Sequence, residues 1–164
     1  MKIGDVIFRP LAPSDNVELA VMIRTILDEL EVPQVGSTYE DKSLDLMYES
    51  FSVDGAAYFV AEYKTKLLGG AGIIHLNDAP DDVCELQKMY LSQTTRGMGI
   101  GSKLLTICLE KARDLGYKRC YLETMSYMKA AQALYVKNGF EYLDQRMGNT
   151  GHYVCPVWMI RNID

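Results

Sequence analysis

Long hydrophobic runs are missing from this 164-residue chain. No window approaches the ~18 apolar residues of a membrane-spanning helix, and the first residues, 1–5, open no apolar segment of a signal peptide. Internal repeats and low-complexity segments are also missing. Because a chain of this length can bury a substantial core by itself, we expect one domain over residues 1–164, located in the cytoplasm and not acting on a membrane.

Paired cysteines and an excess of positive charge are missing too. Cys84, Cys108, Cys120 and Cys155 form no C-x-x-C pair, so we expect buried thiols and predict neither a disulfide framework nor a metal site. The net charge of −5 argues against nucleic acid as a partner, since phosphate binding needs a basic field. An acidic protein is compatible with a cationic or amine substrate.

The hydrophobic periodicity that is present predicts an α/β chain with a mixed sheet. We expect strands over 6–11, 57–62, 67–76, 83–91, 119–124, 140–143 and 153–160, and helices over 15–31, 40–52, 100–115 and 129–137. The order is therefore β-α-α-β-β-β-α-β-α-β-β. Asp15 and Glu18 form a capping-box pattern at the first helix. Gly69, Gly70 and Gly72 indicate a bulge or a close backbone approach in their strand.

A glycine-rich turn, Arg96-Gly97-Met98-Gly99-Ile100-Gly101, joins the strand over 83–91 to the helix that follows. Glycines permit positive φ and close approach of a ligand to the backbone, and the N-terminus of a helix attracts anions. The turn therefore predicts a phosphate site. It is neither a P-loop nor a dinucleotide fingerprint, because Ser102 or Leu104 stands where those motifs require glycine.

Arg96-x-x-Gly99-x-Gly101 instead matches the [QR]-x-x-G-x-[GA] signature of the GCN5-related N-acetyltransferase (GNAT) superfamily, which this chain resembles. The Arg9-Pro10 strand before an aspartate-capped helix resembles the first βα unit of that superfamily. The run from Leu134 to Phe140 resembles its late L-Y-x-x-x-G-F segment. The resemblance covers nearly the whole chain. It implies a mixed, mostly antiparallel sheet flanked by helices, with acetyl-CoA as the co-substrate.

The resemblance also implies which residues bind the co-substrate. The pyrophosphate would lie on the backbone N–H groups of the glycine turn, and the pantetheine arm would run beside the preceding strand. The corresponding residues are Met89, Tyr90, Leu91, Arg96, Gly97, Met98, Gly99, Ile100, Gly101 and Ser102. Ala131 retains a small-residue fit, whereas Met128 stands where many members carry an asparagine that contacts CoA.

Two residues are candidates for proton transfer. Tyr135 occupies the position of the tyrosine that can donate to the departing sulfur, although it could instead only pack its ring. Glu85 lies at the offset of the base glutamate in histone-type members, although it could instead pair with a lysine. Strand alternation would put positions 85, 87, 89 and 91 on one face. Glu123, His75 and His152 are alternative bases.

These features together predict an acyl-CoA-dependent N-acyltransferase that moves acetyl by direct attack to the primary amine of a small or amino-acid-like molecule. A protein or peptide N-acetyltransferase and a non-catalytic acyl-CoA sensor are the alternatives. We expect the acceptor pocket to be built from the first two helices, their linker and the loop 145–151. The protein could be a monomer or a homodimer.

Overall fold

The computed structural model describes residues 1–163, which form a seven-stranded sheet in the order β1-β2-β3-β4-β5-β7-β6. The strands are β1 Ile7–Pro10, β2 Ala57–Tyr63, β3 Lys66–His75, β4 Val83–Leu91, β5 Arg119–Thr124, β6 Glu141–Leu143 and β7 Val157–Asn162. Only β4 and β5 pair in parallel; the other neighbouring strands are antiparallel. The predicted fold class, a mixed and mostly antiparallel sheet flanked by helices, is confirmed.

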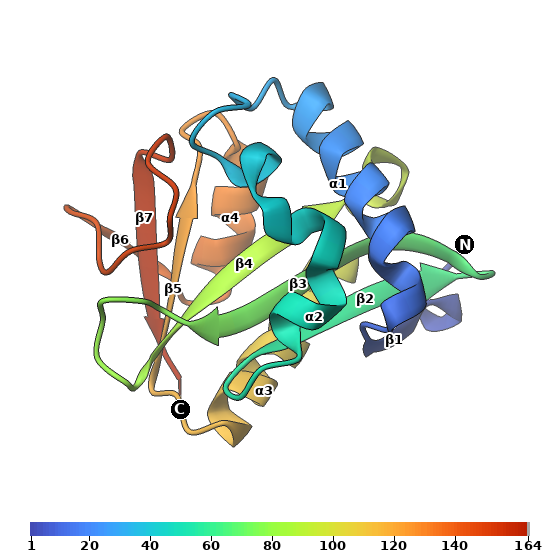
Figure 1. The fold of residues 1–164 in the computed structure, drawn as a ribbon. Helices are drawn as coiled ribbons and strands as arrows, with labels where there is room; N and C mark the ends of the chain where they lie inside the picture. The colour runs from blue at the N-terminus through green and yellow to red at the C-terminus, as the bar shows by residue number, and fades with distance from the viewer. Residues whose placement is uncertain (164) are drawn as a thin grey trace.

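Helices cover both faces of the sheet. They are α1 Asn16–Glu29, α2 Met47–Phe51, α3 Ile100–Asp114 and α4 Lys129–Lys137. In Figure 1, α1 and α2 lie over the near face and α3 and α4 lie behind the sheet. Each face has its own hydrophobic core. We call the one around α1 and α2 the α1 core, and the one around α3 the α3 core.

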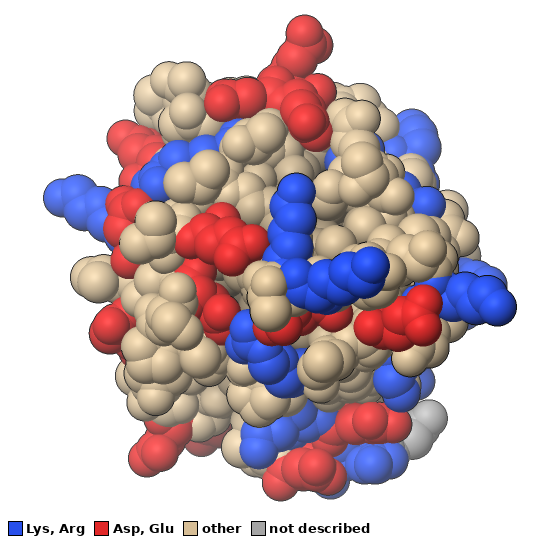
Figure 2. All heavy atoms as spheres, turned by 90° about the vertical axis from the view of Figure 1, so that its right-hand side faces the viewer, with Lys and Arg blue, Asp and Glu red and all other residues tan. Residues whose placement is uncertain are grey.

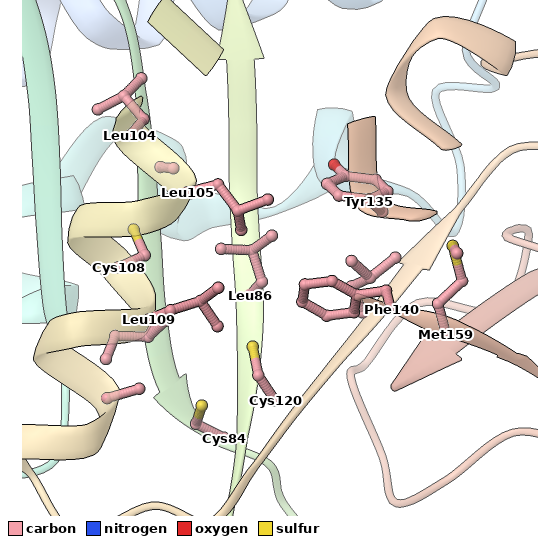
Figure 3. Packing of buried hydrophobic residues seen from close by; sticks show 14 of the residues in the cluster. Cys84, Leu86, Leu104, Leu105, Cys108, Leu109, Cys120, Tyr135, Phe140 and Met159 are labelled. Atoms are coloured by element: carbon pink, nitrogen blue, oxygen red, sulfur yellow. The ribbon is translucent and has the colours of Figure 1, made fainter. Parts of the chain in front are cut away.

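The α3 core follows from the helical spacing of apolar residues in α3. Leu104, Leu105, Cys108 and Leu109 recur at three- and four-residue intervals and are buried. Figure 3 shows Leu105 and Leu109 extending toward Leu86 of β4, with Tyr135 and Phe140 on the other side of Leu86. The predicted burial of the cysteines in apolar surroundings holds for Cys84, Cys108 and Cys120, and Cys155 is half-buried.

The predicted capping box at α1 is wrong. The two carboxylate oxygens of Asp15 accept hydrogen bonds from the Arg9 guanidinium at 2.7 and 2.9 Å, and one also accepts from the Ala12 N–H at 2.8 Å. Glu18 accepts from the Leu67 N–H of β3 at 2.9 Å. Bidentate pairing with arginine is stronger than a neutral cap, so Asp15 binds Arg9 of β1 instead, while Glu18 fastens α1 to β3.

The helix predicted over 40–52 is much shorter. Two 3₁₀ turns, Thr38–Glu40 and Lys42–Leu46, precede α2. Between them Asp41 is extended and accepts a hydrogen bond from the Ser43 N–H at 2.9 Å. An aspartate that bonds the backbone two residues on favours a turn over a continuous helix. This segment therefore presents side chains in a way that a regular helix would not.

The final strand begins later than predicted. It starts at Val157, because Pro156 cannot donate to a strand ladder, and it continues to Asn162 opposite Arg119. The preceding residues form a loop in which the Tyr153 N–H donates to the Gly36 carbonyl at 3.2 Å. The loop that follows β6 therefore contacts the linker that follows α1.

Two surface properties bear on the classes of partner. Within residues 1–163, none of the helices has both the length and the apolar character needed to cross a bilayer. On the face that Figure 2 shows, acidic and basic side chains are interspersed rather than gathered into a large area of one sign. That face offers no continuous basic surface of the kind that binds a nucleic acid backbone.

Candidate active site

Strands β4 and β5 separate at the centre of the sheet. They pair only where Val83–Glu85 lies beside Arg119–Tyr121. Beyond Glu85, β4 runs on to Leu91 and β5 runs on to Thr124 with no pairing between them. The two strands therefore diverge and leave a V-shaped opening.

A β-bulge lies in the same part of β4. Gly70 of β3 pairs with Tyr90, and Gly72 pairs with Gln87, so β4 contains one extra residue here. Lys88 takes the left-handed conformation, with φ of 50°. The Tyr58 ring packs on Gly70 and Gly72, where a Cβ would not fit, and its hydroxyl donates to the Lys88 carbonyl at 2.8 Å. The close backbone approach predicted from these glycines is therefore present. The extra residue at this point lies in β4 rather than in the glycines' own strand, β3.

The bulge changes which side chains share a face. Cys84 and Leu86 before it, and Met89 and Leu91 after it, all pack in the α3 core, whereas Tyr90 packs in the α1 core. The expectation that positions 85, 87, 89 and 91 share one face is therefore wrong. Glu85 lies on the other face from Met89 and Leu91, because the extra residue reverses the alternation.

A cavity of about 650 Å³ lies at this opening and reaches both helical layers. One wall, which we call the turn side, is formed by Arg96, Gly97 and residues 99–102 with Ala131, Leu134 and Tyr135 of α4. The opposite wall, which we call the linker side, is formed by Ile26 and Leu30 near the end of α1, the linker residues Val32, Ser37 and Thr38, and by His152 and Cys155. The cavity therefore passes through the sheet between β4 and β5.

The turn side begins with an open helix N-terminus. Gly97 and Gly99 have φ of 77° and 80°, and Gly99 is the N-cap of α3 with no side chain to accept from the first N–H groups. No described atom lies within 4 Å of where a Cβ on Gly97 would be. Uncapped N–H groups and the helix dipole together favour an anion at this point.

The predicted cofactor-binding residues gather at this cavity with one exception. Those that line it are Met89, Tyr90, Leu91, Arg96, Gly97, Gly99, Ile100, Gly101, Ser102 and Ala131. The Met98 side chain packs against the α3 core instead. Met128, which replaces the asparagine expected by resemblance, also lines the cavity.

Glu85 lies at the apex of the opening and is only 5% exposed. Burial raises the pKa of Glu85 to about 8; a hydrogen bond from the Gln87 amide at 2.6 Å opposes the rise, and the nearby Glu123 carboxylate adds to it. A carboxyl group that ionises near neutral pH has the pKa that suits a general base. The alternative expected from the sequence, a pair with a lysine, is absent from the described residues.

Glu123 is bound on both carboxylate oxygens. Oε1 accepts from the Tyr121 hydroxyl at 2.8 Å and lies 3.1 Å from Nε of Arg146, and Oε2 accepts from the Thr150 hydroxyl at 3.1 Å. These partners hold the loop after β6 onto β5. Because both oxygens have partners, this geometry is less suited to a base than that of Glu85.

The two histidines differ in position. His75 ends β3 and does not line the cavity. His152 lines it and is half-buried, and burial lowers the pKa of His152, so the ring is neutral at pH 7. Its Nε2 lies 3.9 Å from Oδ2 of Asp41.

Tyr135 lies on the turn side and is 7% exposed. Its ring packs against Phe140 with centroids 5.8 Å apart, and Figure 3 shows the hydroxyl pointing away from Phe140. Within the described residues that hydroxyl has no hydrogen-bond partner. Burial raises the pKa of Tyr135 far above that of an exposed tyrosine, so the phenol keeps its proton at neutral pH. Tyr135 therefore both packs in the core and offers a free donor to the cavity.

Sequence reasoning missed the buried ion pair beside Glu85. The Lys88 ammonium, only 3% exposed, lies 2.7 Å from Oδ2 of Asp41 and 3.4 Å from the Gln87 side-chain oxygen. Burial alone would raise the pKa of Asp41, but the Lys88 charge and hydrogen bonds with Lys88 and Ser43 lower it to about 2. No local pattern marks this pair, since the two residues meet only through the fold.

The expected composition of the acceptor pocket is partly wrong. The first helix and the linker do line the cavity, but α2 and the loop 145–151 do not; His152 and Cys155, just after that loop, take their place. In the described part of the chain, no cluster of three or more histidine, cysteine, aspartate or glutamate side chains could hold a metal ion.

Comparison with known proteins gives a consistent result. The model of the acetyltransferase (GNAT) family matches residues 24–140. YjgM of Escherichia coli (strain K12), an uncharacterized N-acetyltransferase, is 42% identical over 158 residues, which are 96% of this chain and 95% of that protein.

Solved structures share the fold. An acetyltransferase of the GNAT family from Staphylococcus aureus Mu50 superposes with a TM-score of 0.86 at 21% identity, over 97% of this chain and 99% of that one. A GNAT superfamily phosphinothricin acetyltransferase from Sinorhizobium meliloti, in complex with AcCoA, superposes with a TM-score of 0.76 at 21% identity, over 97% of this chain and 89% of that one.

Proposed function

The chain belongs to the acetyltransferase (GNAT) family, and we propose that it transfers acetyl from acetyl-CoA to the primary amine of a small molecule. The observation that carries this proposal is the opening between β4 and β5. It lies between an uncapped helix N-terminus on one side and a buried carboxyl group on the other. A phosphate-bearing thioester and a nucleophile could meet there from opposite layers of the protein.

The turn side suits the donor. In our proposal the N–H groups of residues 96–101, with Ser102 close, bind the pyrophosphate, and the backbone of Met89–Leu91 binds the pantetheine arm. Met98 would contribute through its backbone, because its side chain packs in the α3 core. Ala131 leaves room beside the arm. The AcCoA-bound neighbour from Sinorhizobium meliloti, which shares this fold, supports acetyl-CoA as the co-substrate.

The chain supplies groups for both proton transfers. Acetyl-CoA brings the activated acetyl group when it is bound. Ionised Glu85 takes a proton from the acceptor nitrogen, directly or through a water, before or during its attack on the thioester carbonyl. The Tyr135 hydroxyl donates a hydrogen bond or its proton to the departing sulfur. Its free donor suits this role, and its raised pKa keeps the phenol protonated at neutral pH, so that it can donate a hydrogen bond to the sulfur.

A small-molecule acceptor agrees with where Glu85 lies. It is almost fully buried at the apex of the opening, and small molecules bind in buried, concave sites of this kind. A protein substrate would need an extended surface groove that leads to the same point. A non-catalytic sensor would have no need for a buried carboxyl group and a free phenol on opposite walls of one cavity.

The deciding experiment measures release of free CoA thiol from acetyl-CoA with a panel of amines and peptides. Turnover with a small amine is the expected result. Turnover with peptides alone would favour the protein-acetylating alternative. Thermal stabilisation by acetyl-CoA without turnover on any acceptor would favour the sensor.

Tyr135→Phe tests the acid role. We expect kcat to fall about 10²-fold while the Kd for acetyl-CoA stays nearly constant, because only a proton donor is removed. Tyr142→Phe is the matched control. Tyr142 is an exposed residue outside the cavity whose hydroxyl donates to Gln132 at 3.0 Å, so kcat should not change. A weaker Kd with unchanged turnover at saturation would refute the role of Tyr135.

A further inference from the structure

The linker side of the cavity has an apolar wall. Ile26 and Leu30 near the end of α1 and Val32 just after it face the cavity, and none of the three carries a polar side-chain atom. Ser37 and Thr38 add hydroxyl groups, and both residues are buried. Apolar side chains therefore form one part of the linker side, beside His152 and Cys155.

The charges near this wall neutralise one another. The Lys88 ammonium is paired with Asp41 at 2.7 Å, and Asp41 itself does not line the cavity. The Glu123 carboxylate is bound by Arg146, Tyr121 and Thr150.

Glu85 is different. One of its carboxylate oxygens accepts from Gln87, and the other has no hydrogen-bond partner among the described residues. On the linker side, therefore, a single carboxyl group has an oxygen that is not already bound by the protein, and it can receive one amine.

We propose that the acceptor is a monoamine with an apolar body that packs on Ile26, Leu30 and Val32, and that polycations are excluded. This inference rests on the proposed function. The amine lies at Glu85, at the apex of the opening. The chemical class is an aliphatic or arylalkyl amine, or an amino-acid-like molecule with an apolar side chain. Polyamines and aminoglycosides lie outside it.

Desolvation is the physical reason why polycations are excluded. A second ammonium group that entered this side would lose its hydration and find no free carboxylate in return, which is strongly unfavourable. For the reacting amine the same surroundings are helpful. Apolar contacts lower the pKa of an ammonium group, which brings it closer to the neutral form that attacks the thioester.

Thiol release with matched acceptors tests the class. We expect kcat/KM for isoamylamine, phenethylamine and leucinamide to exceed that for spermidine and kanamycin by about tenfold or more. A preference for the polycations, or equal values, would overturn this inference and leave the proposed function standing. Lack of turnover with every amine would overturn both.

Val32→Asp tests the wall. A carboxylate at this half-buried position should lower kcat/KM for phenethylamine about tenfold and raise that for spermidine, while the Kd for acetyl-CoA is unchanged. Val35→Asp is the matched control, because Val35 is exposed on the same linker and does not line the cavity. If the two substitutions changed kcat/KM for phenethylamine equally, or if Val32→Asp had no effect on it, the apolar wall would not bind the acceptor.

Discussion

The turn side and the linker side of the cavity are built by different means. The turn side uses regular elements and a glycine turn close together in the sequence, and it presents backbone N–H groups. The linker side joins the segments around Val32, Lys88 and His152, which are far apart in the sequence, and it presents side chains. Under the proposed function, recognition of the donor is encoded by a short motif, whereas recognition of the acceptor depends on how distant segments pack.

Contacts between distant residues hold the linker side together. Asp41 pairs with Lys88 on the bulge and lies 3.9 Å from His152 in the loop after β6. Gly36, with φ of 75°, bonds Tyr153 through its carbonyl and leaves no room for a Cβ beside the Tyr153 ring. Substitutions could alter these contacts without changing the glycine turn, and under the proposed function they would change which acceptor binds.

Among the substitutions that should affect the turn side and the linker side differently, Glu85→Gln is expected to have the largest effect. A general base acts only when ionised, so wild-type kcat/KM should rise with pH up to about 8 and then level off. With glutamine this rise should vanish. At pH values well above 8, kcat should be about 10²-fold lower, while the Kd for acetyl-CoA should not change.

The measurement needs an acceptor amine with a pKa below about 7, so that titration of the amine itself does not add to the profile. Parallel pH–rate profiles of the two proteins would exclude Glu85 as the base. A loss of acetyl-CoA affinity would instead mean that Glu85 contributes to the binding of acetyl-CoA on the turn side.

Asp41→Asn should have the next largest effect. It leaves the Lys88 ammonium buried without its counter-charge, so we expect a loss of about 2 kcal/mol in the free energy of unfolding. The acceptor KM should also rise, because Asp41 holds the 3₁₀ segment against β4, whereas the Kd for acetyl-CoA should stay constant. Denaturant unfolding and steady-state kinetics measure the two effects.

Asp45→Asn is the control for this pair. Asp45 bonds Arg24 in an ion pair on the surface, at 2.7 Å, which contributes little to stability because solvent screens it. If Asp45→Asn destabilised the protein as much as Asp41→Asn, burial of Lys88 would not be the cause.

Gly97→Ala should have the smallest effect, on the turn side alone. The added methyl group would lie in open space where the donor phosphates are proposed to bind, so we expect the Kd for acetyl-CoA to rise about tenfold. The KM for the acceptor should not change.

Gly116→Ala is a matched control at the opposite end of α3. Gly116 also has positive φ, 91°, and open space around its Cβ position, but it lies outside the cavity. Both alanines should lower the free energy of unfolding by about 1 kcal/mol, since both are forced into the left-handed region. If both weakened acetyl-CoA binding alike, backbone strain rather than contact with the donor would explain the result. Isothermal titration calorimetry measures the affinities.

The sequence predicted the parts of the molecule that local chemistry determines. The glycines at 97 and 99 define the turn, and the apolar spacing of α3 defines its buried face. The positions of Glu85 and Tyr135 in the cavity also agree with the resemblance, although their roles stay predictions.

What the sequence did not predict depends on long-range contacts. Asp15 binds Arg9 rather than the start of α1, and Asp41 interrupts the expected second helix. The left-handed conformation of Lys88 is stabilised by Tyr58 from another strand. A lysine in the sequence does not by itself indicate this conformation. Each of these features depends on residues that become neighbours only after folding.

The bulge at Lys88 has a consequence for comparing relatives of this protein. If one residue were deleted between Gln87 and Met89, the end of β4 would reverse its orientation. Met89 and Leu91 would leave the α3 core, and Tyr90 would enter it. A relative with a gap at this point could keep the glycine turn unaltered and still present a different set of side chains to its acceptor. Under the proposed function, we therefore expect the length of β4, as well as its composition, to influence which substrate binds.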